Sequence, residues 1–593
     1  MTSTAVTPIT ASDGVTLAVH RHTEIDPQRP TILAIHGWPD NHHVWDGVAE
    51  EFAEHYAGRY NFVAYDVRGA GESSCPAGRS GYEFAQLISD IGAVIDSLGL
   101  DERAKVHLLA HDWGSIQAWA AVTDDSVMGK VGSFTSISGP HLRYAGAFLR
   151  SARSPRTLGH VARQLLASGY IAFFLSPGVP EVLFRSGLGV KAVEALERIG
   201  RSSTRSQRIR TPRSIGDYVH GLNLYRENMP APMVSPGRQL PNTKVAVQVL
   251  VPRKDMFVTP ALQRFTGAIP DGGRVITIEG GHWVVTSRPD VVARLTAEWV
   301  DRNAATETAA GATLVRSGPR AVQGKLALVT GAGAGIGRAT AVELARRGAR
   351  KVVIVDRVLA AANDSADAVR AVGADAAAYR ADVSDEKAMN DLAAQVLSEH
   401  GVVDILVNNA GIGMAGRFLE TTSANWEDII GINVRGVISG CRAFGAQMVE
   451  RGEGGTIINL ASATAYLPSK SMVAYSTTKA AVLGFSESLR ADLADEGITV
   501  TAVRPGFVNT NIAKSTVYAG LSAEQQERAR QQADAAYRRR NYTPEATAKA
   551  IVKAVKTGPA VLPIAAESRI AYVLRRISPS MIRLLARIDI RRI

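Results

Sequence analysis

The chain has 593 residues, too many for one hydrophobic core, and at about 100 to 200 residues per domain this length suggests two to four domains. Hydrophobic residues make up 46% and charged residues 21%, as in ordinary globular proteins, and no apolar stretch approaches the roughly 20 residues that span a bilayer. The net charge of +11 comes without zinc-binding spacing or an RNA-binding aromatic motif, so we expect neither a metal nor nucleic acid as a partner. Because the chain opens with MTSTAVTPIT, which has no signal-peptide pattern, and because Cys75 and Cys441 lie far apart, we expect a reducing, cytosolic compartment.

Two blocks in which β-rich runs alternate with helical patterns predict two mainly parallel α/β domains. Between them, NAATETAAGATLVRSGPRAV is small, polar and weakly periodic, as is typical of a linker. We therefore expect a first domain over residues 1–303, a linker over 304–322, a second domain over 323–565 and a basic tail over 566–593.

The first candidate motif, HGWPD, follows the strand-like run TILAI. It predicts a turn whose backbone N–H groups could help to form an oxyanion hole, which stabilises negative charge on oxygen during hydrolysis. The turn contains His36, Gly37, Trp38 and Pro39.

The second motif, LLAHDWGS, ends an apolar run at Asp112. An aspartate at this place would ordinarily cap the following helix. Ala110 and Gly114 instead fit a nucleophile elbow, in which small residues on either side let the strand and the helix approach closely. With Asp in place of the usual Ser, attack on carbon would give an alkyl ester rather than an acyl-enzyme.

An aspartyl ester needs water to break it, so a histidine base and an orienting acid should follow downstream. Asp255 comes just after the apolar run VAVQVLV, and His282 comes in EGGHWVV behind the run RVITI. Nucleophile, acid and histidine thus occur in the chain order of an α/β-hydrolase triad. We expect these three side chains to meet at one end of the sheet.

Three segments, HGWPD, HDWG and the DVRGAGES run at residues 66–73, resemble the epoxide hydrolase branch of the α/β-hydrolase superfamily. The resemblance implies an α/β-hydrolase fold with a helical lid at about residues 140–240. SGYIAFFLSPG and GLNLYRENM resemble the lid segments that supply two epoxide-activating tyrosines, and this assigns the two roles to Tyr170 and Tyr225. The lid departs from the family at residues 174–176, where Phe-Leu-Ser replaces the usual Phe-Gln before Pro-Gly.

Two other interpretations of the first domain stay open. Haloalkane dehalogenases share the aspartate nucleophile and the tryptophan after it, here Trp113. Paired phenols favour the epoxide, because a departing alkoxide needs a proton and a departing halide does not. The domain could also lack activity and serve as a lipid-binding or oligomerising module.

In the second domain, LALVTGAGAGIG reads as a strand, a glycine-rich turn and the start of a helix, where the backbone could approach a pyrophosphate. The turn contains Gly331, Gly335, Ile336 and Gly337. Asp356 ends the next strand-like run, and its carboxylate there can accept hydrogen bonds from ribose hydroxyls and repel a 2′-phosphate, which favours NAD. Arg357 could instead hold that phosphate, so NADP stays open.

The segment YSTTK places Tyr475 and Lys479 on one helix face, where the ammonium would lower the pKa of the phenol. Together with the T-G-x-x-x-G-x-G spacing it resembles the short-chain dehydrogenases/reductases. The resemblance implies a Rossmann-type fold, hydride exchange between NAD(P) and an alcohol or ketone, and homo-oligomers. It assigns the substrate oxygen to Ser462 and a proton-relay water to Asn433. It assigns further cofactor contacts to Asp382, to Asn409 in NNAG, and to Pro505, Gly506 and Thr510 in RPGFVNT.

The tail has apolar residues at helical spacing on both sides of Pro579, with arginines on the other faces. The apolar positions are Ile570, Val573, Leu574, Ile577, Met581, Leu584, Leu585 and Ile588; the arginines are Arg569, Arg575, Arg576, Arg583, Arg587, Arg591 and Arg592. This pattern suits a helix at an anionic membrane surface or against an acidic partner, and equally a docked terminal helix with a solvated basic face.

Together the two halves resemble the epoxide hydrolase/short-chain dehydrogenase fusion proteins of mycobacteria. The resemblance implies a bifunctional enzyme that turns an epoxide into a vicinal diol and exchanges hydride with an alcohol or ketone. The tail adds the hypothesis that the substrates are hydrophobic, lipid-like molecules met at the inner face of a membrane.

Overall fold

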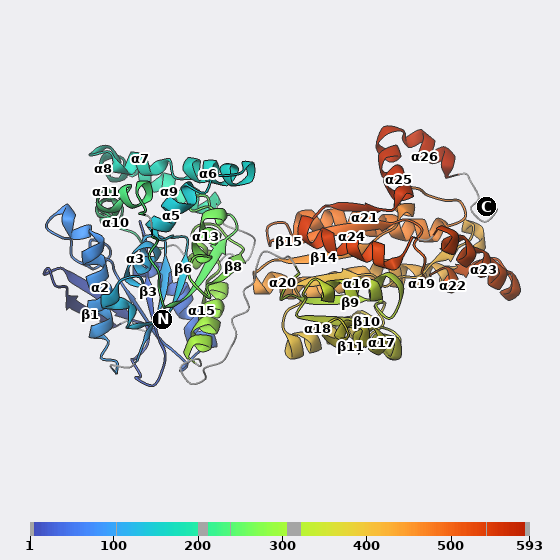
Figure 1. Cartoon of the computed structure of the whole chain (residues 1–593), viewed down its shortest axis with the longest axis horizontal. Helices are drawn as coiled ribbons and strands as arrows, with labels where there is room; N and C mark the ends of the chain where they lie inside the picture. Colours follow the sequence, from blue (N-terminus) through green and yellow to red (C-terminus); the bar gives the residue numbers. More distant parts are fainter. Residues whose placement is uncertain are drawn as a thin grey trace. The chain divides into compact units, whose positions relative to one another are not determined.

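The computed structural model describes residues 5–101, 104–199, 211–237, 239–304, 322–510, 512–540 and 542–586. The chain divides into two compact units, Met1–Arg316 and Ser317–Ile593 (Figure 1). Each unit contains one large, mainly parallel sheet with helices, which confirms the predicted α/β fold class. Apart from its two end residues, the expected linker lies outside the described residues.

The sheet of the first unit has the order β1-β2-β4-β3-β5-β6-β7-β8. Only the pairs β1–β2 and β2–β4 are antiparallel. The central strands are buried on both faces, which explains why their sequences are continuous apolar runs rather than alternating ones. The strands are β1 (Ala5–Thr10), β2 (Thr16–Arg21), β3 (Thr31–Ile35), β4 (Asn61–Tyr65), β5 (Val106–His111), β6 (Val131–Ile137), β7 (Ala246–Pro252) and β8 (Arg274–Ile278).

Helices cover both faces of this sheet and bury two separate apolar cores. One core is formed with α2 (Phe84–Ser97) and α3 (Trp113–Ala121), and the other with α1 (Asp46–His55) and α15 (Pro289–Ala304). The other helices of this unit outside the insertion described below are the short α4 (Asp125–Met128) and α14 (Val284–Ser287), together with α13 (Pro260–Gly267). The carboxyl ends of the parallel strands stay open for a site, as in other sheets of this kind.

A helical insertion separates β6 from β7 and covers one end of the unit, as the layer of α6 to α11 in Figure 1 shows. Its helices are α5 (Leu142–Leu149), α6 (Pro155–Ala167), α7 (Tyr170–Leu175), α8 (Val179–Arg185), α9 (Leu188–Ile199), α10 (Ile215–His220), α11 (Leu222–Asn228) and α12 (Ala231–Val234). We call this insertion the lid. Within the described chain no single helix has the length and apolarity to cross a bilayer; Thr157–Leu175 and Val179–Arg185 meet both criteria only as a pair bent by 90°.

The second unit contains a fully parallel sheet of order β11-β10-β9-β12-β14-β15-β17. Helices α16 and α24 pack on one face and α18, α20 and α21 on the other. The strands are β9 (Leu326–Thr330), β10 (Lys351–Asp356), β11 (Asp375–Arg380), β12 (Ile405–Asn408), β14 (Gly455–Leu460), β15 (Ile498–Pro505) and β17 (Val561–Ile564). The helices are α16 (Gly335–Arg346), α17 (Leu359–Arg370), α18 (Glu386–His400), α19 (Ser423–Ile430), α20 (Gly436–Arg451), α21 (Val473–Asp492), α22 (Ile512–Ser515), α23 (Ala523–Arg540) and α24 (Pro544–Thr557).

The tail forms two helices, α25 (Ala566–Ile577) and α26 (Pro579–Leu585), which stand out from the body of the second unit (Figure 1). The hydroxyl of Ser568 donates to the backbone oxygen of Arg504 at 2.7 Å, which fastens the first turn of α25 to the end of β15. The guanidinium of Arg504 is fully buried and stacks 3.5 Å from the ring centre of Tyr466, with the ring of Tyr572 beyond it. Of the tail positions discussed above, Arg587, Ile588, Arg591 and Arg592 lie outside the described residues.

Candidate active sites

The turn between β5 and α3 has the strained geometry of a nucleophile elbow. Asp112 has φ +51°, a conformation that non-glycine residues rarely adopt. A Cβ atom on Gly114 would collide with the backbone oxygen of Ile35, so only glycine lets α3 start this close to β3. The side chain of Asp112 does not cap α3, which removes the ordinary explanation for an aspartate at a helix start.

The side chains of Asp112, Asp255 and His282 meet at the carboxyl ends of β5, β7 and β8. Nε2 of His282 lies 3.4 Å from Oδ2 of Asp112, and Nδ1 of His282 lies 3.2 Å from Oδ1 of Asp255. All three residues are buried. Two carboxylates hold the imidazole in one orientation, in which its neutral form can accept a proton from water.

The electrostatics of this triad favour a charged histidine. Burial opposes the charge, but Asp255 and Asp112 outweigh it and raise the pKa of His282 to about 10. Burial likewise opposes the charge of Asp255, yet His282 and the backbone N–H of Val258 hold the pKa of that carboxyl below its ordinary value. At neutral pH the free site therefore contains His282 as an imidazolium.

The HGWPD turn contributes one backbone donor to the site. The N–H of Trp38 donates to Oδ1 of Asp112 at 2.8 Å, where it can hold negative charge on that oxygen. Gly37 is required here, since a Cβ atom would lie 2.5 Å from Oδ1 of Asp112. The imidazole of His36 does not face Asp112: its Nε2 accepts a hydrogen bond from the N–H of Val67 at 2.8 Å. Pro39 follows Trp38 through a cis peptide bond.

The two lid tyrosines share a pocket with Asp112, which Trp113 also lines. The ring of Tyr170 on α7 lies edge-on to the ring of Tyr225 on α11, with ring centres 6.2 Å apart. Burial, reinforced by the charge of Asp112, raises the pKa of both phenols. Both therefore remain protonated and can donate to an oxygen atom bound beside Asp112.

Sequence reasoning missed the residues that hold the lid and the acid in place. Gln164 on α6 accepts hydrogen bonds from the backbone N–H and hydroxyl of Thr259, at 2.8 and 2.7 Å, and donates to the backbone oxygen of Phe257 at 2.9 Å. Gln263 donates to Oδ2 of Asp255 at 3.0 Å. A buried glutamine on an amphipathic helix was the available signal for Gln164, but its partner could not be identified without the fold.

The lid segment that departs from the family is fastened by a neighbour of Tyr225. Arg226 donates to the backbone oxygens of Phe174 and Ser176, at 3.1 and 2.8 Å, and forms an ion pair with Glu181. These contacts tie α7 and α8 to α11. They hold the two tyrosine-bearing segments together despite the unusual residues at 174–176.

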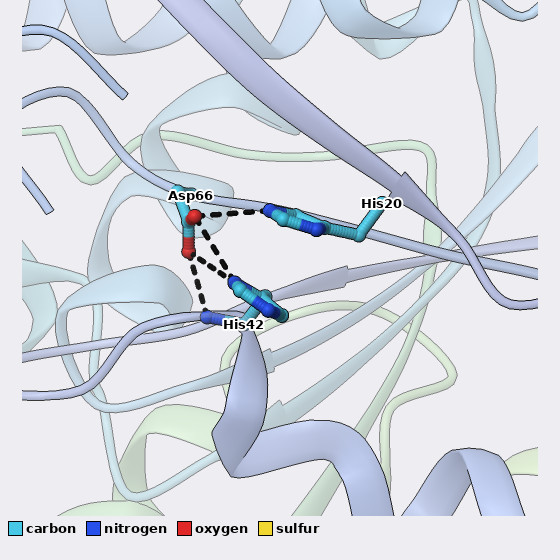
Figure 2. A group of neighbouring side chains, drawn as sticks. All are labelled: His20, His42 and Asp66. Atoms are coloured by element: carbon cyan, nitrogen blue, oxygen red, sulfur yellow. Dashed lines mark hydrogen bonds and ion pairs between the residues drawn. The ribbon is translucent and has the colours of Figure 1, made fainter. Parts of the chain in front are cut away.

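A second buried cluster, shown in Figure 2, joins His20 and His42 to Asp66 of the DVRGAGES run. Nε2 of His20 and Nδ1 of His42 lie 3.0 and 2.9 Å from the carboxylate oxygens of Asp66. The same oxygens accept the backbone N–H groups of His42 and Glu72, at 2.8 and 2.9 Å. Although burial opposes the charge, the hydrogen bonds from the histidines lower the pKa of Asp66 strongly. The carboxylate is already fully hydrogen-bonded, which favours a structural brace at the end of β4 over a metal site.

In the second unit, the glycine-rich turn lies against the segment that contains Asn409. A Cβ atom on Gly331, which has φ +60°, would lie 2.7 Å from the Cα atom of Ala410. One on Gly337 would lie 2.5 Å from Nδ2 of Asn409, whose amide donates to the backbone oxygens of Thr330 and Gly331. Without side chains, these glycines leave a cradle of backbone N–H groups at the start of α16.

The other predicted cofactor-binding residues of this region differ in where they lie relative to the glycine turn. Oδ2 of Asp356 accepts the N–H of Gly333 at 2.9 Å, so a carboxylate lies directly beside the glycine turn. Arg357 is exposed, and Ile336 packs partly buried against the core. Oδ1 of Asp382 accepts both the N–H and the hydroxyl of Ser384, and these bonds lower its pKa.

Ser462, Tyr475 and Lys479 lie close together at the carboxyl end of β14. Nζ of Lys479 lies 5.8 Å from the ring centre of Tyr475 and donates to the backbone oxygen of Leu460 at 2.9 Å. Burial lowers the pKa of Lys479 to about 8. The structure differs from the expected electrostatics at Tyr475: burial raises the pKa of this phenol, and only the hydrogen bond with Ser462 opposes the rise. A desolvated ammonium that faces a carbonyl does not compensate for the burial of the phenol.

Asn433 lies in a π-helical turn between α19 and α20 and is completely buried. Its amide accepts from the N–H of Ile412 at 2.9 Å and donates to the oxygen of Ile412 at 3.0 Å. The turn aims Asn433 at the segment next to Lys479, since a Cβ atom on Gly411 would meet Asn433 and Lys479 at 3.1 and 3.4 Å. Asn433 thus lies near the ammonium of Lys479, where it can position a water molecule or the lysine.

The loop after β15 places Thr510 beside the glycine turn. A Cβ atom on Gly335 would lie 3.4 Å from Thr510, so the two segments are in contact distance. Pro505 ends β15, and a Cβ atom on Gly506 would collide with Glu567 of the tail. Oε1 of Glu567 accepts the N–H of Phe507 at 2.7 Å, and Oε2 accepts Arg540, also at 2.7 Å. Sequence reasoning missed Glu567, because it treated the tail as a separate element.

Comparison with known proteins assigns both units to families. The family model of the alpha/beta hydrolase fold matches residues 30–171, and that of the short chain dehydrogenases matches residues 325–519. The probable oxidoreductase EphD of Mycobacterium tuberculosis is 38% identical over 600 residues, which cover 98% of each chain. The 3-oxoacyl-[acyl-carrier-protein] reductase FabG of Staphylococcus aureus is 37% identical over 184 residues, 31% of this chain and 74% of that protein. Among solved structures, a short chain dehydrogenase/reductase from Burkholderia phymatum in complex with NAD is 31% identical and covers 44% of this chain and 95% of that chain, with a TM-score of 0.41.

Proposed function

Because this chain belongs to the family of the mycobacterial EphD oxidoreductases and joins an α/β-hydrolase domain to a short-chain dehydrogenase domain, we propose that it is an epoxide hydrolase and a nicotinamide-dependent oxidoreductase in one polypeptide. The two domains together make it a bifunctional hydrolase and oxidoreductase. We propose in addition that the hydrolase substrate is an epoxide, that it reacts through an aspartyl ester, and that the substrates are lipid-like.

The observation that carries the epoxide proposal is the common pocket of Asp112, Tyr170 and Tyr225. Oδ1 of Asp112 accepts the N–H of Trp38, and Oδ2, which faces Nε2 of His282 at 3.4 Å, is the oxygen that would attack an epoxide carbon. The new C–O bond forms as the C–O bond of the ring breaks, and the ring oxygen takes a proton from a phenol. A buried phenol with a raised pKa donates well to an alkoxide and keeps its proton until that moment.

The second half-reaction hydrolyses the ester. Esterification removes the charge of Asp112, so one of the two carboxylates that keep His282 charged is lost and the pKa of the imidazole falls. The imidazolium returns its proton to the tyrosinate and can then take one from water. The resulting hydroxide attacks the ester carbonyl, and the N–H of Trp38 stabilises the oxyanion. When the acyl C–O bond breaks, the departing alkoxide takes the proton of the newly formed carboxylic acid, which releases the diol and restores the carboxylate of Asp112, with His282 again an imidazolium.

A single turnover in heavy-oxygen water tests the ester. Excess protein converts a fatty-acid epoxide, and mass spectrometry follows the diol and the peptide that contains Asp112. We expect an unlabelled diol from the first turnover and label in the Asp112 peptide. Label in the diol itself would mean direct attack by water and would end the ester proposal. An absence of diol with lipid still bound would favour the binding-module interpretation.

The dehalogenase remains the second hydrolytic candidate because Trp113 and the elbow are shared. The phenol pair favours the epoxide, since it provides protons that a departing halide does not need. Release of halide from haloalkanes, at a rate comparable to hydrolysis of epoxides, would overturn the proposed substrate class.

The residues of the second unit fit a nicotinamide cofactor. The glycines let the turn before α16 pack closely against Ala410 and Asn409, as a turn that presents backbone N–H groups to a pyrophosphate requires, and the carboxylate of Asp356 lies beside it where a ribose would bind. When bound, NAD(P) supplies or accepts the hydride. Tyr475 would exchange a proton with the substrate oxygen, Ser462 would orient that oxygen, and Lys479 would hold the ribose side of the site. Because a carboxylate repels a 2′-phosphate, we favour NAD, and a lower KM for NADPH than for NADH would contradict this preference.

We extend the proposal to lipid-like substrates and to membrane contact by the tail. Apolar side chains on α25 and α26 are exposed, with Ile577 74% and Leu584 63% accessible, and arginines flank them. Such a surface suits anionic lipid. Replacement of Val573 and Ile577 by Ser should weaken binding to phosphatidylglycerol vesicles, and unchanged binding would end this part of the proposal.

Two further parts concern assembly and pathway. Short-chain dehydrogenases commonly associate through their helices, so we propose a homo-oligomer through the second unit, which light scattering would test.

We also propose that the diol released by the first site is oxidised to a hydroxyketone by the second. Formation of NADH from the purified diol is the expected result, and its absence would end the sequential pathway.

A further inference from the structure

On helix α6 of the lid, the leucines are exposed to solvent instead of packing against the hydrolase domain. Leu158, Leu165 and Leu166 are 58%, 57% and 84% exposed. The buried positions of the same helix are Val161 and Gln164, which are 6% and 3% exposed. A surface helix normally turns its large apolar residues to the core, so this arrangement needs an external partner.

Exposed apolar side chains also occur on α8 and α9, which belong to the same lid layer (Figure 1). On α8, Val179 and Val182 are 60% and 69% exposed, and Leu188 at the start of α9 is 62% exposed. The segments Thr157–Leu175 and Val179–Arg185 together have the length and apolar composition of a bilayer-spanning segment, although they bend by 90°. A bent segment of this composition suits the surface of a bilayer rather than its full thickness.

The charges around this surface indicate which kind of bilayer it would meet. Between residues 150 and 199, every charged side chain that the structure describes as exposed is basic. These side chains are Arg150, Arg153, Arg163, Arg185, Lys191 and Arg198. The acids of the segment, Glu181, Glu194 and Glu197, are half-buried or buried and form ion pairs with arginines. Exposed leucine and valine side chains, in a segment whose described exposed charges are all basic, match a bilayer that contains anionic lipid.

The opposite side of α6 lies on the catalytic pocket. Gln164 and Ser168 line the pocket that contains Asp112, and Tyr170 and Ile171 follow on α7. Gln164 also clamps the loop after Asp255 through Thr259 and Phe257. Gln164 on the pocket wall is therefore the sequence neighbour of the exposed Leu165, so one helix has both the outer apolar residues and part of the wall of the Asp112 pocket.

We propose that the outer surface of the lid, formed by Leu158, Leu165, Leu166, Val179, Val182 and Leu188, docks on an anionic lipid bilayer. This surface belongs to the first unit and is separate from the tail. The docking does not depend on the reaction at Asp112, so its test and that of the epoxide proposal can fail independently.

Sedimentation of the full-length protein with vesicles tests the surface. The lid variant is Leu165→Ser/Leu166→Ser, and the matched control is Phe418→Ser/Leu419→Ser, which removes another exposed apolar pair, 60% and 92% accessible. With mixed phosphatidylglycerol and phosphatidylcholine vesicles, we expect the partition coefficient to fall about tenfold or more for the lid variant and not for the control. Arg163→Glu should weaken binding to these vesicles and leave the weaker binding to pure phosphatidylcholine unchanged.

A second measurement reports the position of the leucines directly. An environment-sensitive dye on Leu166→Cys, in a Cys75→Ser background, should shift to shorter wavelength when vesicles are added. Equal binding of the lid variant and the wild type, without a dye shift, would overturn the proposal, as would loss of binding only in Val573→Ser/Ile577→Ser. A change of oligomer size in the lid variant, seen by light scattering without lipid, would assign the surface to a second copy of the chain and would also overturn it.

Discussion

Nε2 of His282 lies 3.4 Å from Oδ2 of Asp112, and this contact couples the protonation of the base to the charge of the nucleophile. The second carboxylate, Asp255, holds the other side of the imidazole at 3.2 Å. As long as both acids are charged, the histidine is held as a cation with a pKa of about 10. The reaction that consumes the charge of Asp112 is thus the event that frees His282 to act as a base.

Asp112→Asn should lower the pKa of His282 from about 10 toward its ordinary value of 6.5, because one of two attracting carboxylates is removed. Histidine-selective nitrogen labelling and NMR would measure it. The stability that the charge of His282 adds is complete below about pH 6.5 and is lost as the pH rises through about 10. Because the pKa of His282 is lower in the variant, the variant should lose this stability at a lower pH than the wild type. Asp96→Asn, at an exposed ion pair, is the control and should leave the titration unchanged.

His282→Gln should separate the two hydrolytic steps. Attack by Asp112 does not need a base, whereas ester hydrolysis does, and general-base catalysis contributes roughly 10²- to 10⁴-fold. With a slow epoxide, we expect one covalent adduct per chain in the intact mass spectrum, on the Asp112 peptide. A variant that turns over normally, or that never forms the adduct, would argue against this division of roles.

Tyr170→Phe and Tyr225→Phe should each slow alkylation about 10- to 100-fold, and the double variant more, since each removes a proton donor to the leaving oxygen. Tyr144→Phe is the control, because that phenol donates to the backbone oxygen of Pro241, away from the pocket. Stopped-flow fluorescence of the pocket tryptophans would follow alkylation. Equal rates in all variants would remove the tyrosines from the mechanism.

Lys479→Met should abolish the oxidoreductase and change the pH dependence of stability. Since burial lowers the pKa of Lys479 to about 8 from 10.5, the folded protein binds fewer protons than the unfolded chain between these pH values. The stability contributed by this group therefore rises with pH over that window, and the buried ammonium is unfavourable at pH 7. The stability of the variant relative to wild type should be most favourable at pH 7 and should decline toward pH 10. Denaturant titrations at several pH values would measure this, and a constant difference would contradict it.

Glu567→Ala should raise the KM for the nicotinamide. The carboxylate holds the N–H of Phe507 and the guanidinium of Arg540, and loss of such charged hydrogen bonds costs about 1.5 to 3 kcal/mol, roughly 10- to 100-fold in binding. Glu524→Ala, which breaks an exposed pair with Arg528, is the control and should change KM little. A fall in kcat with unchanged KM would point to a role other than positioning the loop.

The fold class and most candidate site residues could be predicted from the sequence because both depend on short local patterns. A strand, a small residue, an acid and a glycine define the elbow at Asp112, and three glycines with fixed spacing define the cradle at Gly331. In both cases the backbone geometry requires particular residues within a few positions, so the pattern is readable without the fold.

The residues that the sequence did not reveal act across long separations. Gln164 meets Thr259, and Glu567 meets Phe507, only after the lid and the tail have folded back on the domains. Neither glutamine nor glutamate is distinctive in composition or spacing. The pKa of Tyr475 was predicted in the wrong direction for a related reason: spacing shows that Lys479 is near, but the burial that dominates the phenol depends on the whole packed site.

The attachment of α25 to the end of β15 limits where the chain can be truncated to give an intact dehydrogenase domain. A recombinant dehydrogenase fragment that stops at residue 565 would lack Glu567, Ser568 and Tyr572, and would open the completely buried guanidinium of Arg504 to solvent. Such a fragment would be expected to bind the nicotinamide poorly even if it folds. Point substitutions on the outer side of α25, rather than truncations, are therefore the proper way to separate the membrane behaviour of the tail from the integrity of the enzyme.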